Sequence, residues 1–87
     1  MLPASVENAI SILETAEDAP LTREILVAFC VLEALKHHFP SLVQDKVRRL
    51  SERFRWIREA ESSRFVKQRR IAVARIVAEM GSLQPKL

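Results

Sequence analysis

The 87-residue sequence contains one glycine and one cysteine, and each scarcity excludes a class of site. Gly81 alone cannot build a glycine-rich phosphate-binding loop. Cys30 has no second cysteine with which to form an internal disulfide or a paired-cysteine metal site. Because it stands inside an apolar stretch, we expect a buried thiol in a reducing compartment.

The motifs of catalysis and metal binding are also absent from the sequence. His37 and His38 are adjacent, and adjacent helical positions point about 100° apart, so one metal ion is not easily held by both. There is no HExxH or EF-hand spacing, and no serine stands at a recognisable spacing from a histidine and an aspartate. We therefore expect a protein that is not an enzyme and holds no metal or cofactor.

The first residues do not resemble a secretion signal, because Met1-Leu2-Pro3 lacks a basic region and acidic residues begin at Glu7. The longest apolar run is too short to span a bilayer. From these two features we expect a soluble, cytoplasmic protein without a membrane partner.

That apolar run is Ile25–Leu32, eight consecutive residues in an otherwise charged chain. An element that is apolar on every side has to be surrounded by other elements. Good helix formers follow it, and no turn residue stands before Pro40. The sequence therefore predicts an all-α fold in which a central helix, Arg23 to about His38, is covered by amphipathic helices.

Four helices are predicted in one domain, 1–87, at about 3–16, 22–38, 41–60 and 63–80. Thr22 is a good N-cap for the second helix. Ser41 and Gln44 form the pattern of a capping box for the third, whose apolar residues then follow at alternating spacings of three and four. Gly81 is suited to end the fourth helix, and 82–87 is predicted to be a frayed tail.

Residues 42–80 contain no strong helix breaker, so one long helix is the alternative to two. The apolar stripes of the two halves differ in direction by roughly 80°, and a straight helix would keep one stripe. The change falls at 61–63, where serines are acceptable caps. We expect a break or sharp bend there.

Charge is distributed unevenly between the two halves of the chain. Residues 1–40 carry six acidic and two basic side chains, whereas residues 41–80 carry five acidic and eleven basic ones, nine of them arginine. Arginine suits phosphate and carboxylate, and it stacks on aromatic rings and bases. This asymmetry is the clearest indication of function.

Trp56 lies in the basic stretch and projects about 160° from the apolar stripe of the predicted third helix, beside Arg49 and Arg53. An outward tryptophan among arginines indicates a contact surface. The residues that we predict to bind a partner are Arg48, Arg49, Arg53, Arg55, Trp56, Lys67 and Arg70.

The alternative interpretation is structural. Asp45, Glu52 and Glu59 share the polar side, so part of the charge can close in pairs three or four residues apart. Trp56 can also cover another helix or a second copy of the chain. The segment around Pro40 superficially resembles a helix-turn-helix, but its turn lacks the usual glycine and the helix that follows is too long.

Our leading hypothesis is a small nucleic-acid-associated protein, a regulator or a helical subunit of a nucleoprotein assembly, with mainly backbone contacts and weak sequence specificity. The alternative is an adaptor that docks an acidic protein through the same face. Because four helices leave apolar surface uncovered, we also expect a homodimer unless the chain is part of a larger assembly.

Overall fold

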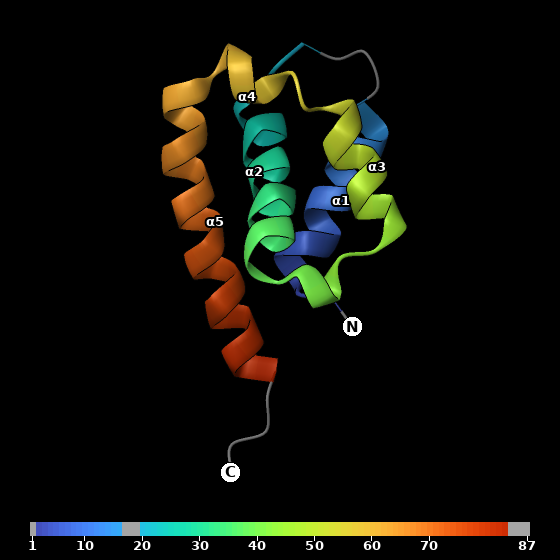
Figure 1. Cartoon of the computed structure of the whole chain (residues 1–87), viewed down its shortest axis with the longest axis vertical. Coiled ribbons are helices and arrows are strands. Elements are labelled where there is room, and N and C mark those ends of the chain that lie inside the picture. The colour runs from blue at the N-terminus through green and yellow to red at the C-terminus, as the bar shows by residue number, and fades with distance from the viewer. Residues whose placement is uncertain (1, 17–19, 84–87) are drawn as a thin grey trace.

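A computed structural model of the chain describes residues 2–16 and 20–83. This part is built from α1 (Ala4–Ala16), α2 (Arg23–His38), a 3-10 turn (Pro40–Leu42), α3 (Asp45–Arg53), α4 (Ile57–Ala60) and α5 (Ser62–Leu83). In Figure 1, α2 lies in the middle, with α5 on one side and α1 and α3 on the other. The predicted all-α bundle around a central second helix is confirmed.

α2 is buried on nearly all sides, as its apolar run requires. Every residue from Ile25 to Leu35 is buried except Val27, which is half-buried. Phe29 is fully buried, and its ring lies 5.8 Å from that of Phe65 on α5. The Thr22 hydroxyl accepts a hydrogen bond from the Ile25 amide at 3.1 Å, which confirms the predicted N-cap.

α1 and α5 flank α2 and meet at one end. Val6, Ala9 and Leu13 bury one side of α1, as their spacing predicts. Ser5, in the first turn of α1, donates hydrogen bonds from its amide and its hydroxyl to the carboxylate of Glu79 near the end of α5. This contact fixes the start of α1 against α5.

The predicted third helix, 41–60, is not continuous. α3 begins at Asp45 and ends at Arg53, and the chain turns before the four-residue α4. The predicted capping box is wrong, because Ser41 lies in the 3-10 turn and Gln44, the N-cap of α3, makes no side-chain capping hydrogen bond.

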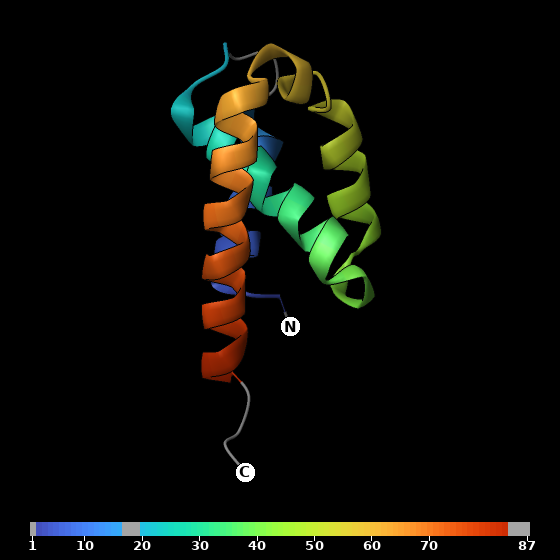
Figure 2. The same ribbon diagram turned by 60° about the vertical axis from the view of Figure 1, so that its left-hand side comes forward.

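Packing explains the interruption. α3 contacts α1 and α2, whereas α4 contacts α5. One straight helix cannot reach both sides of the bundle. The chain therefore crosses over the N-terminal end of α2 as a turn and a short helix, which Figure 2 shows at the top of the molecule.

α5 begins after a break at Glu61, which has a non-helical backbone (φ −135°, ψ 50°). The predicted break near 61–63 is therefore confirmed. The predicted end is wrong, because α5 continues through Gly81 to Leu83 and includes the first two residues of the predicted tail. The remainder of that tail, 84–87, lies outside the described residues.

Within residues 2–16 and 20–83, no helix combines the length and the hydropathy of a transmembrane helix.

Candidate nucleic-acid interface

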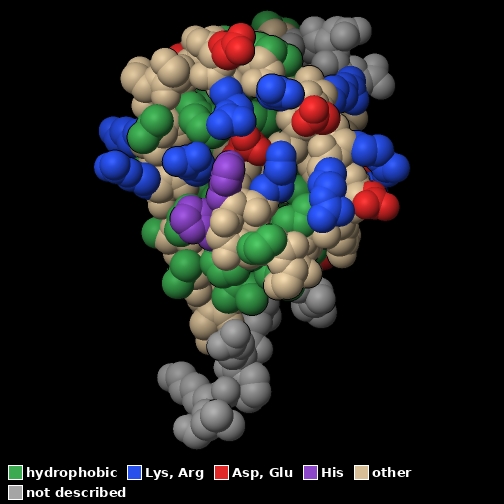
Figure 3. Space-filling view, viewed as in Figure 1, with side chains coloured by type: hydrophobic (Ala, Val, Ile, Leu, Met, Phe, Trp, Pro, Cys, Tyr) green, Lys and Arg blue, Asp and Glu red, His purple; other side chains and the backbone are tan. Residues whose placement is uncertain are grey.

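The basic side chains gather on α3, α4, α5 and the end of α2. In the view of Figure 3, lysines and arginines lie on both sides of the two histidines that mark the end of α2. Acidic side chains are fewer on this face. We call the following residues the basic surface: Lys36, Lys46, Arg49, Arg53, Trp56, Arg58, Lys67, Arg69 and Arg70.

On α3, two of the predicted residues line a shallow hollow. Arg49 and Arg53 share it with Lys46, Leu50 and Glu14, around a volume of about 280 Å³. Lys46 pairs with Glu14 at 3.4 Å, while Arg49 and Arg53 form no ion pair within the described part of the chain. The hollow thus has two guanidinium groups available to an anion.

Two other predicted residues are paired within the chain. Arg48 lies 3.5 Å from Asp45, and Arg55 lies 3.6 Å from Glu52, each three residues apart. Such pairs between residues three apart on one helix are what the structural interpretation of the basic stretch predicts. Both pairs are well exposed, and exposed pairs contribute little stability. The acidic partners therefore reduce the positive charge at these positions but do not remove it.

Trp56 is 46% exposed, in the turn between α3 and α4. Its predicted place beside Arg49 and Arg53 assumed one continuous helix, and the helix ends at Arg53. The tryptophan is therefore outward, as expected, but it stands on the turn and not on the face of α3.

On α5, Lys67 and Arg70 are both exposed. Neither forms an ion pair with any carboxylate in the described ranges. α5 packs mainly on α2, which separates it from α3. The predicted residues therefore form two groups, one on either side of the end of α2.

Between the two groups lies a charged cluster that the sequence did not predict. Glu33 is 2% exposed, and its carboxylate accepts a hydrogen bond from the Ser51 hydroxyl at 2.7 Å. The Lys36 ammonium lies 3.3 Å from one carboxylate oxygen, and Arg58 Nε lies 3.6 Å from the other. Glu33 therefore joins α2 to α3 and α4, and it gathers two cations at the centre of the basic surface.

The ring of Phe65 contacts Arg58 and one further cation, Arg69. Arg58 and Arg69 lie over its ring, with their guanidinium carbons 5.6 Å and 5.5 Å from the centroid. The aromatic face attracts both groups and holds them in place. A signal for the charged cluster was present in the sequence, because Glu33 interrupts a long apolar run, but its partners come from elements far along the chain.

Cys30 is buried one turn before Glu33. Burial raises the pKa of its thiol from 9.0 to about 12; Glu33 adds to this rise and Arg69 opposes it. The thiol is therefore protonated and unreactive in the folded protein. Its burial is as the sequence predicted. The described residues include no group of three or more histidine, cysteine or acidic side chains that could hold a metal ion.

Comparisons of the chain with protein families, with curated proteins and with solved structures gave no match.

Proposed function

We propose that the protein is a small, non-enzymatic nucleic-acid-associated protein that binds the phosphate backbone through its basic surface. It would act as a regulator or as a helical subunit of a nucleoprotein assembly. The observation that supports this most is the group of cations on α3 and α5 that form no ion pair with the described carboxylates: Arg49, Arg53, Lys67, Arg69 and Arg70.

Each of these cations can displace counterions from a polyphosphate. About five phosphate contacts correspond to a roughly 500-fold loss of affinity between about 50 mM and 200 mM salt. Such contacts carry no direct sequence information, so binding should depend weakly on sequence. Trp56 adds a stacking surface, which favours single strands because their bases are free to leave the stack.

Titration of labelled single-stranded RNA, single-stranded DNA and duplex DNA at several salt concentrations tests the proposal. The double variant Arg49→Gln/Arg53→Gln should weaken binding and reduce the slope of log affinity against log salt by about 2. The matched control is Arg23→Gln/Arg75→Gln, which removes the same charge from a different face of the protein. It should leave the slope close to that of the wild type.

Two outcomes overturn the proposal. One is the absence of binding even at low salt. The other is an equal effect of the two double variants, which would mean that net charge and not the basic surface governs binding. A protein partner that stays bound to this surface after nuclease treatment would assign the surface to an acidic protein, which is the alternative function.

Trp56 offers a direct readout, because it is the only tryptophan in the sequence. Single-stranded RNA should quench its fluorescence, and Trp56→Ala should reduce affinity about fivefold or more. Unchanged fluorescence at saturation would exclude Trp56 from the interface.

A further inference from the structure

The bundle leaves one sector of its central helix uncovered. Val27 is the residue of the Ile25–Leu35 segment that is not buried, although the run Ile25–Leu32 to which it belongs is apolar on all sides. Val27 and Lys36 project in directions about 180° apart around α2. The open sector therefore lies on the side of α2 opposite to Lys36 and its part of the basic surface.

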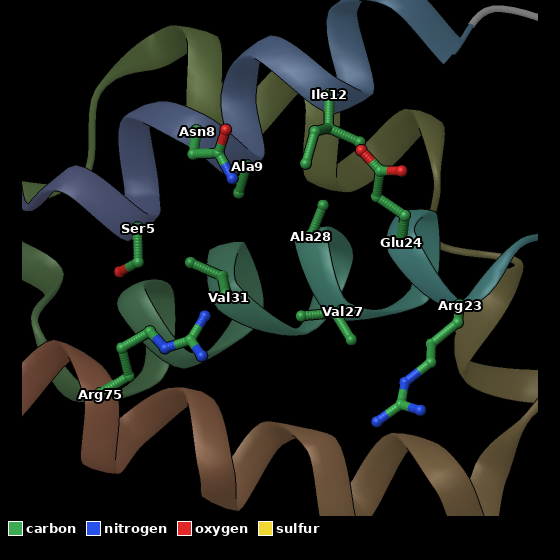
Figure 4. Close-up of a pocket in the computed structure, with 10 residues that line it drawn as sticks. All are labelled: Ser5, Asn8, Ala9, Ile12, Arg23, Glu24, Val27, Ala28, Val31 and Arg75. Atoms are coloured by element: carbon green, nitrogen blue, oxygen red, sulfur yellow. The ribbon is translucent and has the colours of Figure 1, made fainter.

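A groove runs along this sector between α1, α2 and α5. On the α1 side it encloses about 460 Å³, with Ala9, Ile12, Val27, Ala28 and Val31 as its apolar lining. Figure 4 shows that Ala9 and Ala28 face each other from α1 and α2, so small side chains leave the space. On the α5 side the groove continues over Val27 and Val31 to Ile71 and Gln68, through a further 170 Å³.

The groove has the dimensions of a helix site. The part of α2 that lines it, Arg23 to Val31, extends about 12 Å, or two helical turns. Ile71 is 48% exposed at its rim and extends the apolar surface from α2 to α5. Other helices pack around the rest of the Ile25–Leu35 segment, so we expect a further helix to be the element that covers the remaining side.

Among the described residues that line the groove, two are arginines and one is a glutamate, so their net charge is positive. Arg75 extends from α5 toward Val31, and Arg23 extends from α2 toward α5 (Figure 4). Neither arginine forms an ion pair with any carboxylate of the residues described. Of the nearby acids, Glu24 lines the groove, and Glu79 is bound to Ser5. An occupant with acidic residues beside its apolar stripe would complement both arginines.

A second copy of this chain does not supply such a helix. α5 exposes Val66 and Val77, but Arg70 projects within about 40° of both, which gives it the same charge as the groove. The exposed side of α1 is acidic but has no large apolar residue.

We propose that this groove binds an acidic amphipathic helix of a partner protein. The apolar stripe of the helix would cover Val27 and Ile71, and its carboxylates would pair with Arg23 and Arg75. Because the groove lies on the side of α2 opposite to Lys36, the protein could hold a nucleic acid and a protein at the same time. Binding of the helix does not depend on binding of a nucleic acid.

A designed peptide tests the groove directly, whichever protein carries the natural helix. The probe is an alanine-based helix of about 15 residues, with leucines three and four residues apart along one side and glutamates beside them. The control peptide has lysines in place of the glutamates. In NMR titrations of the full chain, the acidic peptide should shift the amides of Ile12, Val27, Val31 and Ile71, and the basic peptide should bind at least about tenfold more weakly.

Variants separate the groove from general charge attraction. Arg75→Glu should weaken the acidic peptide about fivefold to tenfold, whereas Arg70→Glu, the same change elsewhere on α5, should have less than about a twofold effect. Ile71→Ser should also weaken binding, and it should fold normally because Ile71 is exposed. Circular dichroism of each variant checks folding.

Three outcomes overturn the proposal: equal binding of the two peptides, amide shifts confined to the basic surface, or groove amides that shift on dilution of the protein alone. The last would show that a second copy occupies the groove. The two proposals also fail separately, because Arg75→Glu should weaken binding of the peptide and not of the nucleic acid, and Arg49→Gln/Arg53→Gln should do the reverse.

Discussion

Ser51→Ala removes the hydroxyl that donates to the buried carboxylate of Glu33 at 2.7 Å. Hydrogen bonds to charged groups contribute about 1.5–3 kcal/mol, and a buried acceptor left without its donor costs a similar amount. Lys36 and Arg58 still contact Glu33 in the variant, and this limits the loss. We expect the free energy of unfolding to fall by about 2 kcal/mol.

The assay is urea unfolding followed by far-UV circular dichroism. The midpoint should decrease at an unchanged m-value, and a loss of about 2 kcal/mol should lower Tm by roughly 8–16 °C in a domain of this size. Ser11→Ala is the matched control, because Ser11 is exposed on α1, and its effect should stay within about 0.5 kcal/mol.

Glu33→Gln completes a double-mutant cycle with Ser51→Ala. Its amide oxygen can still accept from Ser51, and the half-exposed Lys36 and Arg58 can turn to water, so the loss should be about 1–2 kcal/mol. The double variant should lose less than the two single losses combined, with a coupling of about 0.5–1.5 kcal/mol. Additive losses, or a Ser51→Ala variant as stable as Ser11→Ala, would refute the interpretation that Glu33 and Ser51 act as one unit.

Three further predictions concern the core and the assembly. Phe29→Ala should cost about 3–5 kcal/mol, because the ring is fully buried; a wild-type melting curve would contradict the central position of α2. Cys30 should react with thiol reagents only as fast as the protein opens. Burial raises the pKa of the Cys30 thiol from 9.0 to about 12. The stability that the protonated thiol contributes should therefore be complete below pH 9.0 and disappear as the pH rises toward 12. Cys30→Ala should not show this loss. A homodimer remains predicted unless the chain is part of a larger assembly, and light scattering at micromolar concentration that returns 10.0 kDa would refute it.

The sequence predicted the parts of the fold that are set by local patterns. The apolar run, the Thr22 cap and the spacing on α1 each express a rule that acts within a few residues, and all three are found in the structure. The break at Glu61 was also predicted, because the change of stripe is a property of the sequence. The turn after Arg53 was not, since it depends on α3 and α4 packing against different helices.

The features of the candidate site also separate into those that local sequence patterns predict and those that depend on how the helices pack. The availability of Arg49 and Arg53 follows from helical position and charge. Trp56 is exposed as predicted, but on a turn that the helical pattern did not predict. The cluster around Glu33 could not be predicted, because Ser51 and Arg58 reach it from α3 and α4. The groove is equally a property of tertiary packing, since it exists only where α1 and α5 fail to meet over Val27.

The contact between Ser5 and Glu79 has a kinetic consequence, because the two residues are separated by 74 positions. Closing so long a loop is entropically costly, so this contact should form late, after α1 and α5 have docked on α2. Interactions absent from the folding transition state act on the rate of unfolding. Ser5→Ala should therefore leave the folding rate almost unchanged and shorten the lifetime of the native state. One hydrogen-bonded contact near the two ends of the described chain thus slows its opening.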